Sequence, residues 1–381
     1  MYSGVSGGSI RFCLPPGSLR AMDYRSLPKA LLHDHLDGGL RVETILELAD
    51  AHGYTDLPAA DADGLTDWFD QGRSGSLERY LEAFTHTVAV MNSEESIARI
   101  AYETGIDLAA DGVVYAEIRF GPSLLMIHGL TREAAIEAVL DGFAAAHRET
   151  GIILYVIASA LRHVTDSVEV VRAAIPYLDQ GLIAFDLAGP EAGFPADDHL
   201  AACRLARDAG LGLTIHAGEA DTAASIWRAV AKCGATRVGH GVRIADETDF
   251  DGTKITSLAP LARRIRDHRI PLEVSITSNL DTFAFPSVDE HPFGALYRSG
   301  FVVTLNTDNR LMSRVSLTDE YELAATTFDL GPSDLEEITI NALEAGFGDW
   351  PERRRLIDDV IRPAYASVAS SQAATSESTW T

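Results

Sequence analysis

The chain has 381 residues, of which 46% are hydrophobic and 23% charged, and its formal net charge is −25. This length suits one large barrel domain with insertions, and the composition is that of an ordinary globular protein. The negative charge argues against nucleic acid or an anionic membrane as a partner, and no apolar run is long enough to span a bilayer. These properties do not set the oligomeric state.

The two ends of the chain predict flexible segments around one domain. Residues 1–25 are rich in Gly and Ser and lack a basic stretch followed by an apolar core, so we expect a loose extension rather than a signal peptide. The sequence of residues 367–381 predicts a flexible tail. A single catalytic domain over 26–366 is then expected.

The first predicted strand ends in a potential metal-binding motif. The apolar run Ala30–Leu32 leads into His33, Asp34 and His35. Side chains at positions i and i+2 of a strand point the same way, so His33 and His35 can face one point. Two solvated surface histidines would fit this short motif equally well.

A helical insertion follows this strand. Apolar residues recur at helical spacing in 42–52, 76–90 and 93–110. An insertion of this length could cover the mouth of a barrel or serve only as scaffold.

Strands and helices then alternate to the end of the domain. Seven further strands are predicted at 112–120, 152–159, 182–187, 211–215, 236–238, 270–276 and 301–305. Helices are predicted between them at 132–149, 168–178, 196–209, 223–233, 258–268 and 292–299. Eight such units indicate the α/β class and a closed (β/α)8 TIM barrel. A doubly wound open sheet is the alternative, but no G-x-G-x-x-G follows a strand and no P-loop is present.

Reactive side chains follow three of these strands. His216 and Glu219 come after 211–215, His240 after 236–238, and Asp308 after 301–305. In a parallel barrel, chemistry collects at the carboxyl ends of the strands.

Together with the first motif, these strand ends offer a metal site. The ligands His33, His35, His216 and Asp308 would supply three nitrogens and one oxygen, which suits one zinc ion with a position left open for water. A structural zinc site is disfavoured because the cysteines form no C-x-x-C. We interpret Cys13, Cys203 and Cys233 as buried or inert thiols in a reducing, cytoplasmic compartment. A two-metal barrel is the competing interpretation, but no lysine ends an apolar strand.

Five motifs in order resemble the adenosine deaminase family of amidohydrolase barrels. They are H-D-H-L-D-G from His33, D-L-A-G-P-E from Asp186, H-A-G-E from His216, G-H-G-V-R from Gly239 and N-T-D from Asn306. The resemblance extends from about Leu27 to about Ala366. It implies the fold of that family and a purine nucleoside as the small-molecule partner.

The resemblance also implies a role for each matching residue. The zinc ligands are those named above, Glu219 is the proton donor to purine N1, and His240 positions the water. Asp37 contacts the ribose 5′-hydroxyl, and the Gly189 backbone donates to purine N3. His35 and Asn309 border the substrate, and Ser278 belongs to a supporting motif on the seventh strand.

The chemistry of these residues supports hydrolytic deamination. Zinc lowers the pKa of bound water from about 16 to about 7, giving a hydroxide that can attack purine C6. This attack requires protonation of N1, for which Glu219 needs a raised pKa. We expect a protonated His240 to stabilise the adduct. Asp308 holds zinc and takes the water proton. Adenosine and 2′-deoxyadenosine would yield inosine, deoxyinosine and ammonia.

Some residues depart from the family pattern. Asn309 stands where most members have an Asp that contacts purine N7, and an amide can donate there without a proton. Arg310 could form an outward salt bridge, or it could face the mouth and favour a phosphorylated substrate. Ser275 and Asp281 also differ from the usual seventh-strand motif.

Other functions stay open at this level. A related aminohydrolase could act on adenine, a modified nucleoside or a nucleotide, although the Asp37 carboxylate favours a neutral sugar hydroxyl over phosphate. A non-enzymatic barrel is disfavoured because Glu219, His240 and all four ligands are present. A cytidine-deaminase type is excluded because the chain lacks the H-x-E and P-C-x-x-C pattern.

Overall fold

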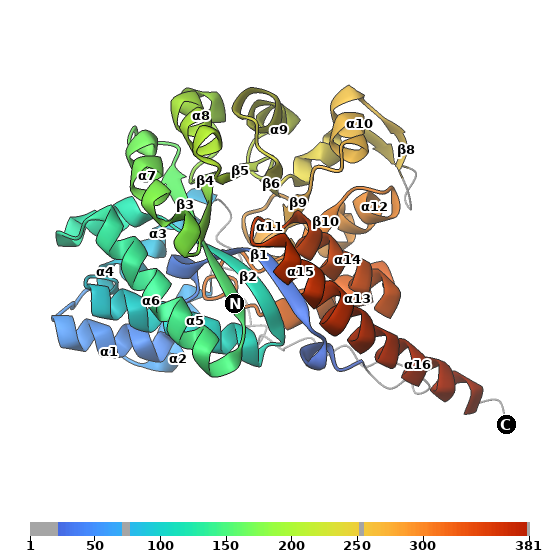
Figure 1. The fold of residues 1–381 in the computed structure, drawn as a ribbon, viewed down its shortest axis with the longest axis horizontal. Coiled ribbons are helices and arrows are strands. Elements are labelled where there is room, and N and C mark those ends of the chain that lie inside the picture. The colour runs from blue at the N-terminus through green and yellow to red at the C-terminus, as the bar shows by residue number, and fades with distance from the viewer. Residues whose placement is uncertain (1–21, 71–76, 251–254, 379–381) are drawn as a thin grey trace, which may run out of the picture.

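The structure, a computed structural model, describes residues 22–70, 77–250 and 255–378 (Figure 1). Across these residues, eight parallel strands form one sheet in the order β1-β2-β3-β4-β5-β6-β9-β10. They are β1 (Lys29–His35), β2 (Val113–Phe120), β3 (Ile153–Leu161), β4 (Leu182–Ala188), β5 (Gly212–Ala217), β6 (Arg237–His240), β9 (Leu272–Val274) and β10 (Val303–Leu305). The strand order follows the chain, as a barrel requires.

Main-chain bonds just beyond β10 close the barrel. The His35 N–H donates to the Asp308 carbonyl at 2.7 Å, and the Asp308 N–H donates to the His33 carbonyl at 3.0 Å. Helix α14 (Pro332–Ala345) contacts both β1 and β10 and covers this seam. The predicted (β/α)8 barrel is therefore confirmed, and the open-sheet alternative is wrong.

The predicted insertion after β1 is confirmed as well. It contains α1 (Val42–His52), α2 (Ala62–Phe69), α3 (Leu77–Glu82), α4 (Phe84–Val90) and α5 (Glu94–Ala110). Figure 1 shows α1, α2, α4 and α5 gathered on one flank of the barrel. Helix α5 begins at a Ser93 cap, whose hydroxyl accepts from the Ser96 N–H. Helix α2 falls in a segment where the sequence predicted none.

The remaining helices surround the barrel or extend it. They are α6 (Arg132–Thr150), α7 (Ser167–Ala174), α8 (Leu200–Ala209), α9 (Ala223–Trp227), α10 (Pro260–Asp267), α11 (Ile276–Asp281), α12 (Phe293–Arg298), α13 (Leu317–Phe328), α15 (Trp350–Leu356) and α16 (Arg362–Ser378). Helix α16 thus continues through most of the segment for which the sequence predicts a tail. No helix in the described ranges is long and apolar enough to cross a membrane.

The structure differs from the sequence prediction around the seventh barrel strand. The strand predicted at 270–276 is shorter, because β9 ends at Val274 and α11 begins at Ile276. The Glu320 carboxylate accepts from the N–H groups of Ile276 and Thr277, which caps this helix start. A hairpin of β7 (Thr248–Phe250) and β8 (Ile255–Leu258) also lies between β6 and β9 and was not expected from the sequence.

The predicted burial of the cysteines is confirmed for the two that the structure describes. Cys203 and Cys233 are buried free thiols, and one thiol forms a hydrogen bond with the other. Cys13 lies outside the described residues.

Candidate metal centre and active site

The four predicted ligands meet at the carboxyl end of the barrel. His33 and His35 end β1, His216 lies on β5, and Asp308 follows β10. Asp308 Oδ1 lies 3.1 Å from His33 Nε2 and 3.3 Å from His35 Nε2, and His35 Nε2 lies 3.2 Å from His216 Nε2. The structure therefore directs three ring nitrogens and one carboxylate oxygen at a common point.

His240 reaches the same place from the end of β6. Its ring, with those of His33 and His216 and the Asp308 carboxylate, offers ligand atoms that all lie within 4.8 Å of one another. Five side chains thus compete for a site that, for zinc, takes four protein ligands at most. The distances among these ligand atoms therefore do not distinguish His240 from the predicted ligands.

The partners of the Nδ1 atoms separate His33 and His216 from His240. His33 Nδ1 lies 3.0 Å from Glu273 and His216 Nδ1 lies 3.0 Å from Asp186. The Asp37 carboxylate lies 3.8 Å from His35 Nδ1, which is beyond hydrogen-bond distance. A carboxylate draws the ring proton to Nδ1 and leaves the Nε2 lone pair free for a metal. The Nδ1 of His240 faces the Asn279 amide instead, at 3.1 Å.

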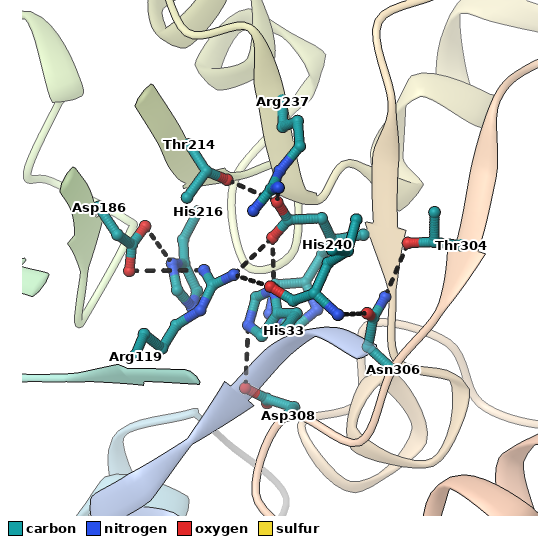
Figure 2. A network of polar contacts seen from close by, with 12 residues as sticks. His33, Arg119, Asp186, Thr214, His216, Arg237, His240, Thr304, Asn306 and Asp308 are labelled. Carbon is teal, nitrogen blue, oxygen red and sulfur yellow. Dashed lines mark hydrogen bonds and ion pairs between the residues drawn. The ribbon is translucent and has the colours of Figure 1, made fainter. Parts of the chain in front are cut away.

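A chain of buried charges adjoins His33 and His216, and Figure 2 labels three of its members, Arg119, Asp186 and Arg237. Glu117 lies 2.5 Å from Arg237, which lies 2.6 Å from Glu273. Arg119 then lies 2.7 Å from Glu273 and 3.5 Å from Asp186. Carboxylates stand at both ends, so this chain carries one negative charge in excess.

The charges around the site leave room for a divalent cation. Asp308 adds a second negative charge to that of the buried chain. Burial lowers the pKa of His35, but the hydrogen bond and charge of Asp308 outweigh burial and raise it. Burial lowers the pKa of His33 and lowers that of His216 to about 3, so neither ring supplies positive charge. Buried charges in proteins are paired or coordinate metals. The donor set and its charge therefore both fit a dication held by His33, His35, His216 and Asp308.

Backbone strain is concentrated at two of these residues. His240 has φ 58° and Asp308 has φ 56°, in the left-handed region that non-glycine residues rarely adopt. Such a conformation costs about 1–3 kcal/mol and persists only where the surroundings impose it. The main-chain bonds from β1 impose it on Asp308, and that strained backbone aims the carboxylate inward.

Glu219 is a buried acid at the edge of the centre. Thr282 donates to its Oε1 at 3.0 Å, and its Oε2 lies 3.5 Å from His240 Nε2. Burial raises the pKa of Glu219 to about 8, and the charges of Asp308 and Glu191 push it in the same direction. The side chain can therefore hold a proton at neutral pH, as a general acid must.

Glu191 holds the turn that carries Glu219. Its carboxylate accepts four consecutive backbone N–H groups, those of residues 218–221, at 2.6 to 3.1 Å. Sequence analysis assigned no role to Glu191, although it closes the quoted D-L-A-G-P-E motif. Four donors on one buried carboxylate fix the main chain at Glu219.

The predicted substrate contacts line the same end of the barrel. Asp37 is 4% exposed, and its Oδ1 has no hydrogen-bond partner among the described residues. Gly189 follows β4 with φ 90°, a conformation that favours glycine. The Asn309 side chain packs against Gly38 so closely that a Cβ there would clash. An unpartnered buried Asp37 oxygen suits a hydroxyl of a ligand.

Three further residues depart from the family pattern, and two of them, Ser275 and Asp281, are buried. Arg310 donates to the Asp34 carboxylate at 3.0 Å and to Thr104 at 3.3 Å, so its predicted salt bridge forms inward rather than outward. Ser275 precedes α11 and Asp281 ends it. Burial raises the pKa of Asp281 to about 7.

Comparison with known proteins identifies the family. The family profile described as adenosine deaminase matches residues 28–363. The chain belongs to the adenosine deaminase family. An adenosine deaminase from Mycobacterium marinum is 50% identical over 348 residues, which cover 90% of this chain and 96% of the relative. This membership confirms the resemblance that the five motifs indicated.

Solved structures with the same fold include other deaminases. The N6-mAMP deaminase of Arabidopsis matches with a TM-score of 0.75 and 27% identity, covering 90% of this chain and 99% of that one. An adenine deaminase from Arthrobacter aurescens matches with a TM-score of 0.78 over 90% and 99% of the chains. Its identity is 23%, so that likeness concerns the fold alone.

Proposed function

We propose that this member of the adenosine deaminase family hydrolyses adenosine and 2′-deoxyadenosine to inosine and deoxyinosine with release of ammonia. The observation that carries the proposal is the buried Glu219, which Thr282 and the Glu191 clamp hold beside the predicted metal centre and whose pKa is raised by burial. The M. marinum relative, similar over nearly its whole length, is named an adenosine deaminase. We further propose that 26–366 form the catalytic domain and that the protein acts in the cytoplasm.

Zinc is the proposed metal, one ion per chain. His33, His35, His216 and Asp308 would hold it, and three nitrogens with one carboxylate oxygen match its preferences. When bound, zinc supplies a water that is activated near neutral pH. Ser278 donates to Asp308 Oδ2 at 2.7 Å and so leaves Oδ1 directed at the centre.

The protein's own side chains would handle the protons and charge of the reaction. Addition of water at C6 disrupts the aromatic ring, and Glu219 lowers this barrier by giving its proton to N1. The proton that the water loses would pass to the Asp308 carboxylate and then to the amine as it leaves as ammonia. His240 lies between Glu219 and the metal ligands, where it can hydrogen-bond the incoming oxygen. The Glu191 clamp keeps Glu219 in place while its proton moves.

The structure favours a nucleoside over a nucleotide as substrate. Phosphate recognition would need a free cation at the mouth, but the Arg310 guanidinium is bonded to Asp34 and Thr104. An ionised Asp37 at the predicted sugar position would repel phosphate. Its unpartnered Oδ1 can instead accept from a sugar hydroxyl.

Turnover of a substrate panel tests this proposal. Purified zinc-loaded protein would be given adenosine, 2′-deoxyadenosine, AMP and adenine, and the ultraviolet change from amine to oxo purine would be followed. We expect rapid conversion of the two nucleosides and loss of this activity in Glu219→Ala. Faster turnover of AMP or adenine by zinc-loaded protein would contradict the choice of substrate.

A further inference from the structure

A line of three buried side chains leads from a backbone N–H to the active site. Phe293 N donates to His291 Nδ1 at 3.2 Å, His291 Nε2 lies 3.3 Å from Asn279 Oδ1, and Asn279 Nδ2 lies 3.1 Å from His240 Nδ1. His291, Asn279 and His240 are 4%, 0% and 1% exposed. All three side chains are thus shielded from solvent.

The direction of each hydrogen bond is set by the first donor. A backbone N–H can only donate, so Nδ1 of His291 accepts, and a neutral His291 must carry its proton on Nε2. Burial lowers the pKa of His291 to about 3, which keeps the ring neutral. His291 Nε2–H then donates to the Asn279 oxygen, which turns the amide nitrogen toward His240.

The same logic determines the protonation of His240. The Asn279 amide nitrogen is only a donor, so Nδ1 of His240 must accept, and the proton of the neutral ring lies on Nε2. Nε2 is the atom that faces Glu219 and the metal ligands. A proton on Nδ1 would place two donors against each other inside the barrel wall.

We propose that His291 and Asn279 are positioning residues that hold His240 as the neutral Nε2–H tautomer, so that His240 donates a hydrogen bond in the active site and does not bind the metal. This inference deepens the proposed deamination and names the state of one group in it. It also explains why His240 is not a fifth ligand: its Nε2 has no lone pair to offer. The proposal differs here from the sequence expectation of a protonated His240, because an imidazolium would need an acceptor where Asn279 has a donor.

The protonation state can be measured directly in the holoenzyme. In zinc-loaded protein labelled with ¹⁵N-histidine, nitrogen shifts distinguish protonated from unprotonated ring atoms, and His240→Asn identifies the His240 signals. We expect a proton on Nε2 alone of His240 and on Nε2 alone of His291. A proton on Nδ1 of His240, or on both its nitrogens, would overturn the proposal. This readout does not depend on turnover, so it stands apart from any failure of the proposed deamination.

Variants test whether the tautomer matters for catalysis. Asn279→Asp has nearly the same shape but offers an acceptor to His240, so we expect the proton to move to Nδ1. The active-site donor is then lost, and kcat should fall about 100-fold, as when one preorganised donor is removed. KM should change by less than about threefold, because the interaction is made mainly in the transition state.

A matched control separates this effect from the loss of any buried polar side chain. His199 is also buried, but it bonds Ser167 and the Arg162 carbonyl, away from this line. His199→Gln should keep the Nε2–H signal of His240 and most of kcat. An Asn279→Asp protein that retains the Nε2–H signal, or that loses no more kcat than His199→Gln, would refute the proposal.

Discussion

His216 and His240 end neighbouring strands, β5 and β6, and their ring centroids lie 5.5 Å apart, yet their Nδ1 atoms meet opposite partners. Asp186 accepts from one ring, and Asn279 donates to the other. The first ring is left with a lone pair at the centre and the second with a proton. In this site, the residue behind a histidine decides whether it serves as a ligand or as a donor.

The largest effect should come from removing the acid beside the donor histidine. Glu219→Gln keeps the shape of the side chain but cannot cycle a proton to N1. We expect kcat to fall about 1,000-fold, within the range for a general acid. Zinc content, measured by elemental analysis, should stay at the wild-type value because the ligands are untouched. A variant within tenfold of wild type would contradict the role of Glu219.

The second-largest effect is expected when the Nδ1 partner of His216 is changed from a carboxylate to an amide, the group that faces Nδ1 of His240. In Asp186→Asn, an amide faces His216 Nδ1 and favours a proton on Nε2, which competes with the metal. We expect zinc affinity to fall about 10- to 100-fold, a typical effect for the partner of a ligand histidine. Competition with a chelator would measure it. Unchanged affinity would mean that the Nδ1 partner does not separate ligand from donor.

The pH dependence of turnover should report the pKa of Glu219, the acid next to His240. Glu219 must be protonated, and because its pKa is raised, kcat/KM should be constant at lower pH and fall as pH rises through the pKa of Glu219. Glu191→Gln removes a negative charge that raises this pKa, so the falling limb should move to lower pH. A limb that stays in place, or moves to higher pH, would argue against Glu219 as the titrating acid.

The smallest effect is expected at Asn309. The amide can donate to purine N7 at any pH, whereas an Asp must be protonated to do so. Asn309→Asp should therefore bind adenosine with a KM within about tenfold of wild type at low pH and weaken as pH rises. A steady-state pH series of both proteins would show this. Complete loss of binding at every pH would refute this role for Asn309.

Local patterns in the sequence predicted the barrel and the groups at its mouth. Each predicted ligand lies at or just beyond the end of an apolar strand, so periodicity and the position of polar residues were enough to predict that His33, His216 and Asp308 lie at the carboxyl end of the barrel. The length of β9 was overestimated because the apolar run from Ile270 to Ile276 contains no signal for a helix start. The cap of α11 comes from Glu320, which is distant in the sequence.

The supporting network was missed because it depends on contacts distant in sequence. Glu273 lies 240 residues from His33, and Asn279 lies 39 residues from His240. One local signal was present, since Glu117 and Arg119 stand two apart within an otherwise apolar strand and thus mark a charged barrel interior. Which charge meets which histidine follows only from the closed barrel.

Stepwise zinc titration of chelated protein, with adenosine turnover followed at each addition, tests the central claim most directly. The account predicts no turnover without metal, and activity that rises in proportion to bound zinc and saturates at one ion per chain. Turnover by metal-free protein, saturation only at two ions, or a fully zinc-bound protein that leaves adenosine unchanged would contradict it.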